Sequence, residues 1–83
     1  MDYILSQHAF EQLQKSGRSQ IREEGIKLAL TTPDYSELDS RTNTIRVWKR
    51  IPDYGDRALG VVYNPHKQPV VIVTVFFDRG FKQ

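Results

Sequence analysis

The 83-residue chain contains no cysteine. This absence excludes disulfide bonds, thiolate nucleophiles and cysteine-ligated metals, and it fits a reducing compartment. The chain also lacks an apolar run near the roughly 20 residues that span a bilayer. Its first residues, MDYILSQHAF, have neither the basic start nor the long apolar core of a signal peptide. We therefore expect a cytoplasmic protein.

Several catalytic motifs are missing as well. The sequence has no glycine-rich phosphate loop and no His-Glu-x-x-His motif, and its two histidines, His8 and His66, are far apart in the chain. No serine lies in the sequence context of a nucleophile elbow. We therefore expect no metal site and no cofactor.

The length suits one domain over residues 1–83, since a chain of this size holds one small hydrophobic core. Its net charge of +2 is unevenly distributed. Residues 1–42 carry five Lys/Arg against seven Asp/Glu, a balance of −2, whereas residues 43–83 carry seven against three, a balance of +4. The second half is thus the better candidate surface for a phosphate-rich or acidic partner, although ordinary solubility explains the same balance.

Two helices are predicted in the first half, over residues 7–16 and 20–32, each with apolar residues at helical spacing. Each is bounded by residues typical of helix ends: Ser6 and Gly17 for the first, Ser19 and Pro33 for the second.

The second half changes to the alternation typical of strands. Three strands are predicted, over residues 43–51, 57–63 and 69–77, and the segments YILS and YSELDS are either short strands or loops. We therefore expect an α+β fold, with two N-terminal helices packed on one face of a twisted antiparallel sheet of three to four strands.

The segment NTIRVWKRI is the clearest candidate for nucleic-acid binding. Alternation places Arg46, Trp48 and Arg50 on one face of a strand, where arginine forks suit phosphate and the indole suits a stacked base. Lys49 falls on the apolar face, so it either extends to the sheet edge or enters a site. The alternative is a solvent-exposed face with Trp48 packed under a loop.

His8 is the best candidate for proton transfer, because imidazole titrates near neutrality and works as an acid or a base. Metal-free RNA cleavage needs those two proton transfers and a cation for the phosphate. Arg57 is either an edge charge or points into a cleft, and the Thr74 hydroxyl is either satisfied in the core or faces a substrate. His8 itself is otherwise a simple helix-start residue, and His66 lies in a predicted exposed hairpin loop.

Four segments carry a resemblance to a known family: SQHAFEQL, LALTTPD, RALGVVYN and VVIVTVFF. Together they resemble domain-of-unknown-function family 4258, which is related to the RelE/ParE-type toxins and the wider barnase-like ribonucleases. The resemblance implies a RelE-like fold. It also implies that His8, Arg57 and Thr74 are the family's polar positions, with Arg46 a looser match.

The leading functional hypothesis is a metal-independent endoribonuclease of toxin–antitoxin type. His8 would act as base or acid, Arg57 and Arg46 would hold the phosphate, and Thr74 would orient either group. Its partners would be RNA, such as ribosome-associated mRNA, and an acidic antitoxin.

The alternative hypothesis is a non-catalytic module on the same scaffold that binds protein or nucleic acid. In that case Trp48, Tyr54 and the basic strand face would make the contacts. DNA binding is disfavoured, because the sequence shows no helix-turn-helix with a basic recognition helix.

Overall fold

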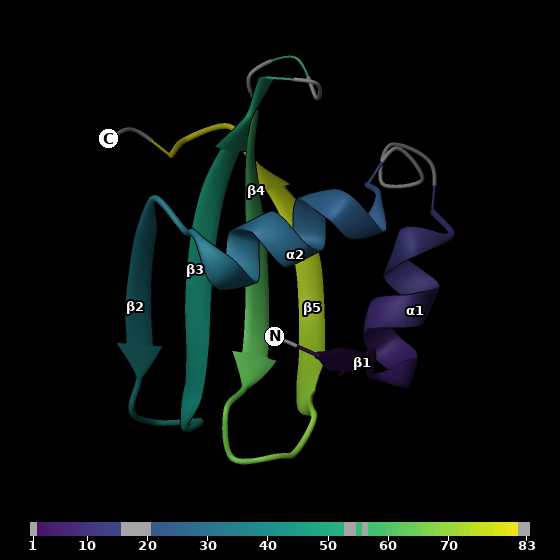
Figure 1. The fold of residues 1–83 in the computed structure, drawn as a ribbon, viewed down its shortest axis with the longest axis vertical. Coiled ribbons are helices and arrows are strands. Elements are labelled where there is room, and N and C mark those ends of the chain that lie inside the picture. Colours follow the sequence, from purple (N-terminus) through teal and green to yellow (C-terminus); the bar gives the residue numbers. More distant parts are fainter. Residues whose placement is uncertain (1, 16–20, 53–54, 56, 82–83) are drawn as a thin grey trace.

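The computed structural model of the chain describes residues 2–15, 21–52, 55 and 57–81 (Figure 1). These ranges contain five strands and two helices. In chain order they are β1 (Tyr3–Leu5), α1 (Gln7–Leu13), α2 (Glu23–Thr31), β2 (Tyr35–Asp39), β3 (Thr44–Ile51), β4 (Arg57–Asn64) and β5 (Val70–Asp78).

The strands form one mixed sheet in the order β1-β5-β4-β3-β2. Strands β2, β3, β4 and β5 pair with one another in antiparallel fashion. Strand β1 pairs with the other edge of β5 in parallel, with Tyr3 opposite Val70. The first strand of the chain thus lies beside the last one. The β4–β5 ladder shifts register at Val62/Tyr63, so Thr74 pairs with Val62 and Ile72 pairs with Tyr63.

The helices begin and end for identifiable reasons. The Ser6 hydroxyl accepts a hydrogen bond from the Ala9 N–H at 3.0 Å, which confirms Ser6 as the N-cap of α1. Two glutamates occupy the first turn of α2, where they complement the helix dipole. This helix ends at Thr31, shortly before Pro33, as predicted. The proposed end at Gly17 and cap at Ser19 lie outside the described residues.

The two faces of the sheet differ in what covers them. α2 crosses the face that holds the hydrophobic core (Figure 1). We call this the helix-covered face, and its fully buried side chains are Val47, Leu59, Val61, Ile72 and Val75. Side chains alternate along each strand, so the residues between these point to the other side. We call that side the helix-free face; its central row is Trp48, Gly60 and Phe76.

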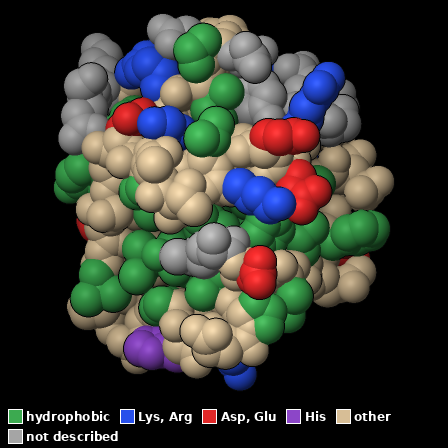
Figure 2. All heavy atoms as spheres, viewed as in Figure 1, with side chains coloured by type: hydrophobic (Ala, Val, Ile, Leu, Met, Phe, Trp, Pro, Cys, Tyr) green, Lys and Arg blue, Asp and Glu red, His purple; other side chains and the backbone are tan. Residues whose placement is uncertain are grey.

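The helix-covered side is shown as a surface in Figure 2. Among the described residues seen there, Lys and Arg side chains are interspersed with Asp and Glu rather than forming one basic patch. Hydrophobic side chains gather below α2, over the strands. The described residues of this surface therefore show no charge pattern that would select a phosphate-rich ligand.

The expected layout of two helices on an antiparallel sheet of three to four strands, described above as RelE-like, is wrong. The sheet has five strands and is mixed. Only α2 lies across a face; α1 flanks β5 at the sheet edge, where β1 ends (Figure 1). The error arose because β1 is three residues long and pairs with a strand at the other end of the chain, which local periodicity cannot indicate.

Candidate nucleic-acid interface

His8 lies in the first turn of α1 with an exposed side chain. Its helix begins beside the start of β5, where the Ser6 N–H donates to the Ile72 carbonyl at 2.9 Å. The Ser6 hydroxyl also donates to the Val73 carbonyl at 3.2 Å. The turn that carries His8 is therefore fixed to the edge of β5, while the imidazole itself faces solvent.

Arg57 begins β4 on the helix-covered face, and its guanidinium carbon lies 3.9 Å from the centre of the Phe77 ring. Phe77 is five residues beyond Ile72 along β5, which corresponds to about 16 Å of strand. The structure therefore places Arg57 and His8 toward opposite ends of β5.

Thr74 lies on the helix-free face, because its partner on β4 is Val62. Arg57 lies on the opposite, helix-covered face, since alternation along β4 places it with the core residues Leu59 and Val61. Its hydroxyl donates to the side-chain oxygen of Gln12, which also accepts the Val75 N–H at 3.2 Å. The Thr74 hydroxyl thus serves to attach α1 to β5. The structure does not bring His8, Arg57 and Thr74 together into one site.

The side chains of β3 alternate between the two faces of the sheet, as the sequence pattern predicts. Val47 and Ile51 belong to the core, so Arg46, Trp48 and Arg50 share the helix-free face. The Arg46 guanidinium carbon lies 6.0 Å from the centre of the Trp48 ring, within the range of a cation–π interaction. Three of the four predicted nucleic-acid-binding residues are therefore neighbours on one surface.

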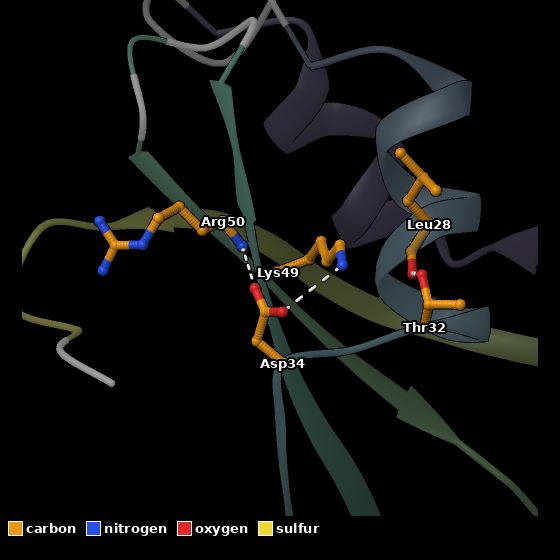
Figure 3. Close-up of polar contacts among 5 residues, drawn as sticks. All are labelled: Leu28, Thr32, Asp34, Lys49 and Arg50. Atoms are coloured by element: carbon orange, nitrogen blue, oxygen red, sulfur yellow. Dashed lines mark hydrogen bonds and ion pairs between the residues drawn. The ribbon is translucent and has the colours of Figure 1, made fainter.

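Lys49 is the fourth, and it points to the other face. Its ammonium lies 3.4 Å from the Asp34 carboxylate, near the end of α2 (Figure 3). The other Asp34 oxygen accepts the Arg50 backbone N–H at 2.8 Å. This backbone hydrogen bond, together with the nearby Lys49 ammonium, lowers the pKa of Asp34.

Two further aromatic residues, which sequence reasoning missed, complete the helix-free surface. Tyr35 of β2 packs beside Trp48 with 5.5 Å between ring centroids. Phe81, which follows β5, stacks on Trp48 at 5.6 Å with an angle of 6° between the rings. The signal for Tyr35 was available, because a strand at YSELD places Tyr35 opposite Trp48. Nothing in the sequence indicated the position of Phe81, since it lies in a polar segment beyond the last strand. Tyr54, the further aromatic residue that the sequence did suggest, lies outside the described residues.

Asp78 connects this surface to the segment that follows it. One carboxylate oxygen accepts the Trp48 indole N–H at 3.0 Å, and the other accepts the Gly80 N–H at 2.9 Å. The indole is therefore held by its edge while Phe81 covers its face.

Two other kinds of site receive no support from the described residues. In those parts of the chain, no three His, Asp or Glu side chains lie close enough to hold a metal ion. Neither described helix is long and apolar enough to cross a bilayer.

Comparison with known protein families gives a match over most of the chain. The model of a protein family described as "Domain of unknown function (DUF4258)" matches residues 5–77, from the end of β1 through nearly all of β5. No curated protein and no solved structure matches the chain. Since the matched residues make up most of the sequence and include both helices, the chain belongs to the DUF4258 family.

Proposed function

We propose that this protein is a non-catalytic RNA-binding module, and that its binding surface is the helix-free face of the sheet. The observation that carries the proposal is the placement of Arg46 over Trp48, with Arg50 two residues further along the same face. A guanidinium presents a planar fork of donors to phosphate, and aromatic rings stack on unpaired bases. Tyr35, whose side chain is 45% exposed, adds an accessible ring beside them.

The geometry supports binding better than it supports cleavage. RNA cleavage without a metal requires an acid, a base and a cation around one phosphate. His8 faces solvent beside the start of β5, Arg57 packs on Phe77 near the far end, and the Thr74 hydroxyl is occupied by Gln12. In this arrangement the three groups do not surround one phosphate, because Arg57 lies on the opposite face of the sheet from Thr74 and toward the other end of β5 from His8.

RNA is favoured over other polyanions for two reasons. A sheet surface with aromatic and arginine side chains suits splayed single-stranded bases. The relation expected between family 4258 and the RelE/ParE-type toxins and barnase-like ribonucleases would also favour an RNA ligand, bound in the cytoplasm. Glu37 is the register partner of Arg46 across β2 and β3, and its negative charge on the neighbouring strand would weaken indiscriminate binding of polyanions.

The test is binding of a labelled single-stranded RNA of about 12 nucleotides, followed by fluorescence anisotropy over a range of salt concentrations. Arg46→Gln is expected to weaken binding about three- to tenfold near 50 mM salt. The variant should also reduce the slope of log K against log salt by about 0.7, the value for one phosphate contact on a single strand.

The matched control is Lys27→Gln, which removes one exposed positive charge from α2 on the helix-covered side. This control should bind RNA as the wild type does. Equal weakening by both variants would mean that only net charge matters, and would contradict a specific surface. Cleavage of the RNA by the wild type, lost in His8→Ala, would overturn the non-catalytic assignment in favour of the ribonuclease.

A further inference from the structure

The segment after β5 folds back across the helix-free face. Figure 1 shows this segment passing behind the sheet from the end of β5 toward β3 and β2. Asp78 fixes the turn, because its carboxylate binds the Gly80 N–H and the Trp48 indole N–H together. The turn therefore places Phe81 over Trp48.

Phe81 covers the Trp48 ring. The two rings are within 6° of parallel, and Phe81 also lies 6.4 Å from the Tyr35 ring, measured between centroids. Trp48 is only 7% exposed, although it lies on the face that neither described helix covers. The indole surface that would suit a base is thus already occupied by a side chain of the same chain.

We propose that Phe81 holds the place of a nucleobase, and that an unpaired RNA base displaces it to stack on Trp48. The inference rests on the proposed function and adds a mechanism of regulation to it. A parallel aromatic ring over an indole is the arrangement that a stacked base adopts. Arg46, already beside Trp48, would then contact the phosphate of the incoming nucleotide.

The covering of Trp48 by Phe81 should lower the affinity of the protein for RNA by a measurable amount. If the covered form predominates, the apparent affinity for RNA is reduced by the fraction of molecules in which Trp48 is uncovered. Removing Phe81 should abolish that reduction. An incoming base would replace the contacts of Phe81 with Trp48 and Tyr35, whereas Arg46 and Tyr35 are already beside Trp48 in the covered form.

The test uses Phe81→Ala in the full chain and follows the emission of Trp48, the single tryptophan. The variant is expected to show red-shifted emission without RNA, and to bind the 12-nucleotide RNA about five- to tenfold more tightly than the wild type. RNA should quench Trp48 in both proteins. Phe81→Tyr should restore wild-type emission and affinity, because tyrosine retains the ring.

Phe10→Ala is the matched control, since Phe10 is an exposed phenylalanine on α1, away from this face. It should change neither emission nor affinity. Asp78→Ala is a second variant that weakens the same covering without removing a ring, and it should also tighten binding. Urea unfolding of each variant establishes that the compared proteins are folded.

The outcomes separate the two proposals. If Arg46→Gln weakens binding but Phe81→Ala leaves it unchanged or weaker, the RNA surface stands and displacement of Phe81 is overturned. If neither the wild type nor Phe81→Ala binds RNA, both proposals fail. Tighter binding by Phe81→Ala, reversed in Phe81→Tyr, supports both.

Discussion

Asp34 precedes β2 by one residue and extends the β2–β3 ladder with its side chain. Its backbone N–H donates to the Trp48 carbonyl at 2.8 Å, and its carboxylate accepts the Arg50 N–H at 2.8 Å. The side chain therefore replaces the partner that a longer β2 would have supplied. From the sequence, the segment before Asp34 is predicted only as the end of a helix. The role of Asp34 in the β2–β3 ladder is not predicted, because a single carboxylate that bonds to a neighbouring strand produces no periodic pattern.

This contact predicts a specific dependence of stability on pH. The pKa of Asp34 is lowered in the folded state, so its charge contributes stability that is fully present above the ordinary carboxyl pKa, near 4. That contribution is lost as the pH falls through the lowered pKa. Asp34→Asn retains an oxygen for the Arg50 N–H but has no charge to lose.

We expect Asp34→Asn to be about 0.5 kcal/mol less stable than the wild type at pH 7, a small value because the carboxylate is partly exposed. The difference should shrink as the pH is lowered from 6 toward 3. Urea denaturation of both proteins across that range measures it. A difference that stayed constant with pH would show that the charge of Asp34 contributes nothing.

At the scale of elements, β4 and β5 contact each other on the helix-free face through Gly60 and the ring of its partner Phe76. A Cβ atom at Gly60 would clash with the Phe76 ring, so the ring occupies the space that any other residue would need. Strand propensity identified both strands from their β-branched and aromatic residues. It could not identify why glycine stands in the middle of RALGVVY, because the reason is a ring on the neighbouring strand.

Gly60→Ala should therefore displace Phe76 and destabilise the protein by roughly 1–3 kcal/mol. In a Phe76→Ala background the same substitution should cost nothing or stabilise, because the obstructing ring is absent and alanine is a better strand former than glycine. A double-mutant cycle measured by urea denaturation separates the two effects. Equal costs in both backgrounds would place the origin of the effect in the β4 backbone instead.

At the scale of the molecule, the sequence predicted the three central strands, the α2 element and the division of β3 into two faces. It did not predict the parallel β1–β5 pair or the edge position of α1. Both depend on residues far apart in sequence, such as Ser6 and Val73, which are 67 positions apart. A local pattern carries no information on long-range pairing, so the sequence could not show where His8, Arg57 and Thr74 lie relative to one another.

Gln12, like Ser6, joins the N-terminal part of the chain to β5. Its side-chain oxygen accepts both the Thr74 hydroxyl and the Val75 N–H at the edge of β5. Gln12→Ala leaves both donors without that acceptor and should destabilise the protein by about 1–2 kcal/mol. Gln14→Ala, at an exposed position just beyond α1, is the control and should change stability little in thermal or urea denaturation. Equal effects of the two substitutions would argue against the edge contact.

The pairing of β1 with β5 also sets an order of events during synthesis. A ribosome releases the N-terminal end first, at about 5–20 residues per second, so β1 and α1 emerge several seconds before the strand they join. In the interval β2, β3 and β4 can pair through short connections, while Ala9 and the partly buried Leu13 of α1 have no β5 to cover them. The apolar side chains of this N-terminal segment therefore stay uncovered until β5 emerges, and during that interval they are accessible to chaperones and proteases.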